Sequence, residues 1–213
     1  MKEFLTEDKV REMIVYIADK IIENKAQLSD IDSQIGDGDH GFGMAGGMRR
    51  AKEKVLVLEN CGNAYKLFEA AGKAMLMSMG GASGVIFGSL YFSGGKEMAP
   101  SDRIDAAGLA NMFNISLLAI KERGKAQVGD KTMVDALEPA VVAMEENREK
   151  GLLTMLLAAE EAARQGMEAT KGMTAKFGRA KNLFERAVGH QDAGAVSVYI
   201  IFRSMREFVE NAR

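Results

Sequence analysis

Three aspartates lie within a short stretch of the chain, and their spacing could hold a metal ion. Asp37 and Asp39 flank a single glycine, so a tight turn can direct both carboxylates toward one centre, which Asp32 can reach from the preceding turn or helix end. Carboxylate oxygens are the ligands that hard cations prefer, and Mg²⁺ usually completes its coordination shell with water and phosphate oxygens. The segment therefore predicts one or two Mg²⁺ ions that hold a phosphorylated ligand.

Other interpretations fit the same segment less well. Asp and Gly are common turn residues, so a solvated acidic turn is the simplest alternative, but the clustering of three carboxylates with His40 favours a site. Three glycines here match the dinucleotide fingerprint, yet that motif follows a strand, and two aspartates occupy its variable positions in this chain. An EF-hand loop from Asp37 would need glycine where the chain has Phe42, and calcium-binding nonapeptides need tandem copies.

Three further polar blocks could contribute to such a site. Gly80–Gly84 has the composition of an anion-binding loop before a helix, although a close packing point between helices is an equal alternative. Gly124–Thr132 nearly matches a P-loop, but Asp130 is inserted before the lysine, so we reject a P-loop. Arg179 and the loop over residues 189–194 form the third block, in which Arg179 could donate to phosphate or lie on an ordinary solvated surface.

The elements that must position these residues are helices. Apolar side chains recur every three to four residues along most of the chain, which has only 2 prolines and 7% aromatic residues. The Val196–Phe202 run has strand propensity, but its helical surroundings favour a helix. We therefore predict an all-α antiparallel bundle. Its apolar stripes indicate about eight amphipathic helices, approximately over residues 7–28, 44–58, 65–79, 83–92, 104–124, 131–144, 152–169 and 196–208.

Composition and charge fit one globular domain over residues 1–213. The chain is 47% hydrophobic and 27% charged, with a formal net charge of -2 and no basic block, so we expect no nucleic-acid partner. A single cysteine, Cys61, and an N-terminus that lacks a signal-peptide pattern predict a cytoplasmic protein. The uncharged stretch Ala74–Gly95 is rich in glycine and serine, so we expect no membrane helix. Methionines on the apolar stripes should fill the core.

Five ordered blocks together resemble the nucleotide-binding L subunit of bacterial dihydroxyacetone kinases and the equivalent C-terminal domain of the ATP-dependent enzymes. The resemblance runs essentially from one end of the chain to the other. It is carried by Asp32-x4-Asp37-Gly-Asp39-His40-Gly41, Gly80-Gly81-Ala82-Ser83-Gly84, Gly124-Lys125 with Gly129-Asp130-Lys131-Thr132-Met133, Gly178-Arg179-Ala180, and Gly189-His190-Gln191-Asp192.

The resemblance implies an eight-helix antiparallel barrel that holds ADP or ATP and two Mg²⁺ ions at one end. It assigns the metal ligands to Asp32, Asp37 and Asp39. It assigns no catalytic acid or base to this chain, because phosphoryl transfer depends mainly on positioning and charge neutralisation. The residues it places around the phosphates and the rest of the nucleotide are His40, Gly41, Phe42, Gly43, Ala82, Ser83, Gly124, Met133, Arg179 and Asp192.

The resemblance also implies a reaction and partners. ADP would remain bound as a coenzyme, a phosphohistidine on an M subunit of the phosphotransferase system would convert it to ATP, and ATP would phosphorylate dihydroxyacetone held by a K subunit. The chain would thus be a subunit of a phosphoenolpyruvate-dependent glycerone kinase. Two alternatives stay open: an ATP-dependent kinase subunit for a related short-chain ketose, and a non-catalytic nucleotide-binding regulator. Whether the chain forms a homodimer is also open.

Overall fold

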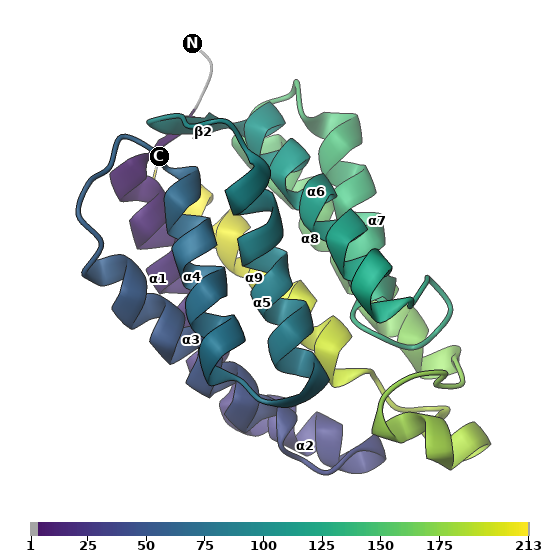
Figure 1. The fold of residues 1–213 in the computed structure, drawn as a ribbon. Coiled ribbons are helices and arrows are strands. Elements are labelled where there is room, and N and C mark those ends of the chain that lie inside the picture. Colours follow the sequence, from purple (N-terminus) through teal and green to yellow (C-terminus); the bar gives the residue numbers. More distant parts are fainter. Residues whose placement is uncertain (1–3, 213) are drawn as a thin grey trace.

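The protein consists mainly of helices in the computed structural model, which describes residues 4–212 (Figure 1). Strands β1 (Phe4–Thr6) and β2 (Arg103–Asp105) form one short antiparallel pair. Two 3₁₀ segments, η1 (Thr170–Gly172) and η2 (Arg179–Ala187), lie between the last two helices. The α-helices are α1 (Glu7–Glu23), α2 (Lys25–Ile35), α3 (His40–Leu56), α4 (Tyr65–Ser78), α5 (Gly81–Glu97), α6 (Ala106–Gly124), α7 (Val134–Asn147), α8 (Leu152–Ala169) and α9 (Ala193–Asn211).

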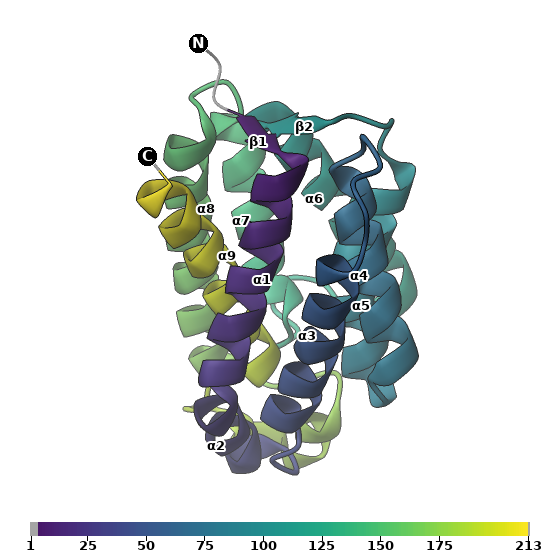
Figure 2. The same cartoon turned by 90° about the vertical axis from the view of Figure 1, so that its left-hand side faces the viewer.

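Long helices close into a ring around a shared hydrophobic core. Within residues 4–212, α1 contacts α3, each helix from α3 to α8 contacts the next, and α9 returns to α1. Figures 1 and 2 show these helices running alternately up and down, with α2 across the lower end. Large buried side chains such as Phe68, Phe113 and Phe202 fill the interior. The predicted all-α antiparallel bundle is confirmed, and the eight ring helices correspond to the eight apolar stripes.

The start of the chain differs from the prediction. The first helix was expected to end near Leu28, but α1 ends at Glu23 and α2 continues to Ile35, so Asp32 is helical. The amide of Asn24 donates to the Lys20 carbonyl (2.7 Å) at the junction. Leu28 and Ile35 are both buried, so the second helix has an apolar side of its own. The β1–β2 pair was not predicted, since each strand has only three residues.

Other predictions about the helices are confirmed. The Val196–Phe202 run lies within α9. Most side chains of this run pack in the hydrophobic core that the surrounding helices form. Many methionines, including Met13, Met44 and Met112, are fully buried in that core. Every helix described within residues 4–212 is too short or too polar to cross a membrane.

Candidate metal and phosphate site

The three aspartates converge at the lower end of the ring. Asp32 lies in the last turn of α2, while Asp37 and Asp39 lie in the turn that leads to α3. One carboxylate oxygen from each lies within 4.8 Å of the others, and no second cluster of three potential ligands occurs within residues 4–212. Gly36 allows this turn to pass close to Asp32, because a Cβ at Gly36 would lie 2.4 Å from Asp32 Oδ1. The local sequence therefore builds the cluster.

The charges of this cluster suit a divalent cation. Burial raises the pKa of Asp39, and the negative charges of Asp37 and Asp32 raise it further. The exposed Arg179 opposes this effect, with its Nη2 atom 2.6 Å from Asp37 Oδ2. A set of oxygen donors that repel one another fits Mg²⁺, which prefers carboxylate and phosphate oxygens. The aspartates predicted as metal ligands are thus brought together.

His40 connects the aspartate turn to the core. Its backbone N–H donates to Asp32 Oδ2 (3.3 Å), and its Nε2 pairs with Ser197 Oγ of α9 (2.8 Å). The ring also packs against Phe87 of α5, with 5.8 Å between ring centroids. Burial lowers the pKa of His40, which favours the neutral imidazole. His40 therefore offers its backbone to the site, while its side chain fixes the start of α3.

Two helix N-termini lie at the same end of the ring. Neither α3 nor α5 has a side-chain cap within the described part of the chain. The His40 and Gly43 N–H groups of α3 donate to Asp32 Oδ2 and to the Asp39 carbonyl, and other N–H groups of the two first turns can bind an anion. Gly41 packs closely on α2, since its Cβ would lie 2.1 Å from the Lys25 carbonyl oxygen. Phe42 and Gly43 follow on the exposed side of α3, and Ala82 and Ser83 lie in the first turn of α5.

The remaining predicted residues lie on the other side of this end. Gly124 ends α6 next to Ile86 of α5, whose Cδ1 atom would lie 3.3 Å from an added Cβ. Met133 is buried at the start of α7 and faces Gly194. Asp192 caps α9 by accepting from the Ala195 N–H (2.8 Å), and burial raises its pKa to about 7. Contacts thus join Met133 to the start of α9 and Gly124 to α5. Figure 1 shows that α6 ends, and α5, α7 and α9 begin, at the lower end of the ring.

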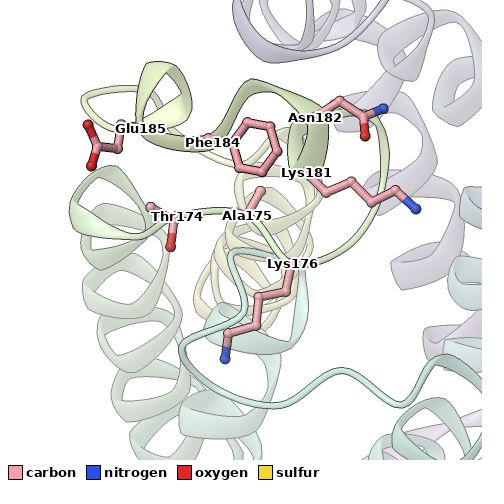
Figure 3. Close-up of a pocket in the computed structure, with 7 residues that line it drawn as sticks. All are labelled: Thr174, Ala175, Lys176, Lys181, Asn182, Phe184 and Glu185. Carbon is pink, nitrogen blue, oxygen red and sulfur yellow. The ribbon is translucent and has the colours of Figure 1, made fainter.

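The segment that carries Arg179 also borders an open surface hollow of about 630 Å³ (Figure 3). Phe184 lies at its wall, largely exposed and with a left-handed backbone (φ 53°). The aspartates do not line this hollow, so it neighbours the candidate site without containing its chemistry. The lining residues are Thr174, Ala175, Lys176, Lys181, Asn182, Phe184 and Glu185.

The sequence interpretation missed a buried polar cluster at this end. Lys131 is 2% exposed, and its Nζ donates to the carbonyls of Thr170 and His190 (both 2.6 Å). Asp135 accepts from the N–H groups of Gly129 (2.5 Å) and Thr132 (2.7 Å). Because the ammonium group of Lys131 is already bonded to protein carbonyls, and because helix α6 precedes the segment, the rejection of a P-loop is confirmed. The spacing Thr132-x-x-Asp135 is a capping-box signal that could have indicated the ordered turn.

Comparisons with known proteins show the family of this chain. The sequence profile of the DAK2 domain matches residues 34–207. The ADP-binding subunit DhaL of a PEP-dependent dihydroxyacetone kinase from Listeria innocua is 37% identical, over 88% of this chain and 89% of that subunit. The ADP-binding subunit DhaL of a PTS-dependent dihydroxyacetone kinase from Lactococcus lactis is 35% identical, over 96% of this chain and 99% of the relative.

Longer kinases also contain a similar region. The crystal structure of the dihydroxyacetone kinase from C. freundii in complex with AMP-PNP and Mg²⁺ superposes with a TM-score of 0.74 at 25% identity. That match covers 93% of this chain but 33% of the C. freundii chain. A D-erythrulose kinase from Mycolicibacterium smegmatis is 34% identical over 91% of this chain, which spans 34% of that enzyme.

Proposed function

Because the chain belongs to the DAK2 domain family, we propose that it is the ADP-binding subunit of a phosphoenolpyruvate-dependent dihydroxyacetone kinase. The observation that carries this proposal is the convergence of three carboxylates at the start of α3, at the end of the ring where α5 also begins (Figure 1). Carboxylates can hold Mg²⁺, and helix N-termini can bind phosphate. The names of the Listeria and Lactococcus relatives support ADP as the ligand.

In this proposal residues 1–213 act as one nucleotide-binding domain, and Asp32, Asp37 and Asp39 hold two Mg²⁺ ions. Bound Mg²⁺ would neutralise charge on the phosphates during transfer. The backbone of α3 from His40 to Gly43 and the first turn of α5 with Ala82 and Ser83 bind the phosphates. Arg179 adds a guanidinium that can pair with phosphate oxygens. Gly124, Met133 and Asp192 complete the nucleotide site on the opposite side.

The partners follow from the same proposal. A subunit of the phosphotransferase system that carries a phosphohistidine, the M subunit, would recharge bound ADP. A dihydroxyacetone-binding K subunit would present the acceptor hydroxyl. This chain would therefore position and stabilise the transferred phosphoryl group without supplying an acid, a base or a nucleophile.

The Asp37→Asn variant tests the proposal directly. We expect it to lose Mg²⁺-dependent ADP binding in calorimetry and to abolish dihydroxyacetone phosphorylation when the K and M subunits and the phosphoryl donor are supplied. Asp30→Asn is a matched control, because Asp30 is an exposed carboxylate on the same helix as Asp32. Unchanged phosphorylation by Asp37→Asn would exclude the catalytic role.

A second candidate substrate is the four-carbon ketose erythrulose. The similarity to a D-erythrulose kinase favours it. In that case free ATP would be the donor, and the purified chain would exchange its nucleotide readily. Identifying the nucleotide released by denaturing the freshly purified protein separates the two phosphoryl donors. Near-stoichiometric ADP supports the coenzyme role, whereas its absence supports exchange with free ATP. A regulator without catalytic function would instead retain nucleotide binding but give no turnover with either ketose and all partners present.

A further inference from the structure

The connection between α8 and α9 is a loop whose two ends meet at its base. Thr170 begins the connection, and His190 lies close to its end. The Gly189 N–H donates to the Lys171 carbonyl (2.7 Å), and the Asp192 N–H donates to Thr170 Oγ1 (3.0 Å). We call residues 170–190 the connecting loop. It carries Arg179, and the residues after it continue to Asp192.

Lys131 joins the two ends of the connecting loop from a different part of the chain. Its Nζ donates to the carbonyls of Thr170 and His190, which are 39 and 59 residues away in sequence. Hydrogen bonds from a charged donor are stronger than neutral ones, particularly where water is excluded. The Thr170 carbonyl also accepts from the Met173 N–H (3.2 Å), so Lys131 adds a second, charged donor there and links it to the His190 carbonyl.

The backbone of Lys131 is also held in an unusual conformation. Its φ is +59°, in the left-handed region that a residue with a side chain rarely adopts. Asp135 holds the residues on both sides by accepting from Gly129 and Thr132 N–H groups. Burial lowers the pKa of Lys131, and the nearby negative charges of Asp192 and Asp135 oppose that shift. Such a strained and fixed position indicates a specific structural demand at this residue.

Farther along, the connecting loop is also bonded to Asp130, the residue before Lys131. Lys176 donates its backbone N–H to the Asp130 carbonyl (3.1 Å) and pairs its Nζ with Asp130 Oδ1 (2.7 Å). At the base, His190 Nδ1 pairs with Gln34 Oε1 of α2 (2.8 Å), two positions from Asp32 in sequence. The connecting loop is therefore fixed to the α6–α7 turn and to the helix that carries a proposed metal ligand.

We propose that Lys131 is a positioning residue that closes the base of the connecting loop, so that Arg179 and Asp192 are held for the nucleotide. The role rests on the nucleotide site proposed above. Lys131 does not itself touch the ligand in this account, because both its observed bonds go to loop carbonyls. Loss of the ammonium group should open the loop and weaken nucleotide binding, while the aspartate turn, built by α2 and α3, keeps its metal affinity.

Three measurements on Lys131→Met test this role. We expect the dissociation constant for ADP, measured by calorimetry with Mg²⁺, to rise by about tenfold, which corresponds to about 1.4 kcal/mol. We expect amide hydrogen exchange to accelerate in residues 170–190 and to stay unchanged in α1 and α4. Binding of Mn²⁺ without nucleotide should be retained or strengthened, because an opened loop withdraws Arg179 from Asp37. Lys171→Met is the matched control, because it removes an exposed lysine from the same loop without removing a bond to a loop carbonyl.

The outcomes separate the role of Lys131 from the identity of the site. If Lys131→Met binds ADP as well as Lys171→Met does, or loses ADP and Mn²⁺ equally, the positioning role is wrong. If the wild-type protein fails to bind ADP, the proposed function is wrong, while the exchange result still tests loop closure. Lys131→Arg keeps a charged donor and should restore part of the ADP affinity.

Should Lys131→Met fail to fold, Thr170→Val decides the question. This nearly isosteric change removes the hydroxyl that accepts from the Asp192 N–H and leaves Lys131 in place. We expect faster exchange at the base of the loop and weaker ADP binding, with Mn²⁺ binding retained or strengthened. Unaltered exchange and ADP affinity in Thr170→Val would overturn the proposal.

Discussion

Replacing Arg179 by glutamine should change metal and nucleotide binding in opposite directions. In the structure, its guanidinium pairs with Asp37 at 2.6 Å. A fixed positive charge there opposes a divalent cation bound to the same carboxylates. With nucleotide present, the same guanidinium is proposed to pair with phosphate. Arg179→Gln should therefore strengthen binding of the metal alone and weaken binding of ADP.

The solvent exposure of the Arg179–Asp37 ion pair limits the gain in metal affinity. The side chain of Arg179 is 71% exposed and that of Asp37 is 34% exposed, so solvent screens their interaction. Exposed pairs contribute about 0.2–1 kcal/mol, which is at most about a fivefold gain in metal affinity when the pair is removed. A hydrogen bond to a charged group contributes about 1.5–3 kcal/mol, so ADP affinity should fall by about tenfold or more.

Mn²⁺ is a suitable probe because it shares the oxygen-ligand preference of Mg²⁺ and its free ion is observed directly by electron paramagnetic resonance. Calorimetry with ADP at saturating Mg²⁺ supplies the second affinity. Lys181→Gln is the charge-matched control, since Lys181 is an exposed cation two positions farther along the same segment. Equal or weaker Mn²⁺ binding in Arg179→Gln than in Lys181→Gln would refute the competition between Arg179 and the metal.

Two further predictions concern stability. Burial raises the folded-state pKa of Asp192 to about 7, so the folded state binds more protons than the unfolded state between about pH 4 and pH 7, and its stability falls as pH rises through that window. In urea unfolding, the free energy of unfolding of Asp192→Asn relative to that of the wild type should increase from about pH 5 to pH 8. A difference in free energy that stays constant with pH would contradict the assigned burial. Gly41→Ala should destabilise the fold by about 1–3 kcal/mol, because its Cβ would lie 2.1 Å from the Lys25 carbonyl oxygen. Gly46→Ala on the same helix, where an added Cβ has no described atom within 4 Å, should raise the melting temperature slightly, and equal effects of the two changes would contradict the close packing of α2 on α3.

The parts of the site that could be predicted from the sequence are those built by neighbouring residues. Asp37 and Asp39 flank one glycine, so their convergence follows from a single tight turn. The ring helices were likewise visible as apolar stripes, since the same side chains that repeat along the sequence face the core. For the last stripe, helical context decided against strand propensity, and the Val196–Phe202 run is indeed helical.

The parts that were missed depend on contacts between distant segments or on weak local signals. Lys131 meets Thr170 and His190 only after α7 and α8 have packed, so its role has no local sequence pattern. Asp32 was expected in a turn or at a helix end after Leu28, because neither the break at Asn24 nor the second helix after it has a clear local signal. The short β1–β2 pair escaped detection for a similar reason, since a three-residue strand shows almost no alternation.

This division between local and distant contacts has a consequence for ligand binding. The aspartate turn is fixed by α2 and α3, with Gly41 in direct contact with α2. The residues proposed to cover the nucleotide instead depend on the connecting loop and its tie to Lys131. Opening that loop would release Arg179 from Asp37 and His190 from Gln34 but leave the contacts between α2 and α3 in place, so metal binding should be retained when nucleotide binding is lost. A variant that loses both metal and ADP affinity has therefore lost the aspartate turn or the fold. A variant that loses only ADP affinity has lost the nucleotide contacts that depend on the connecting loop.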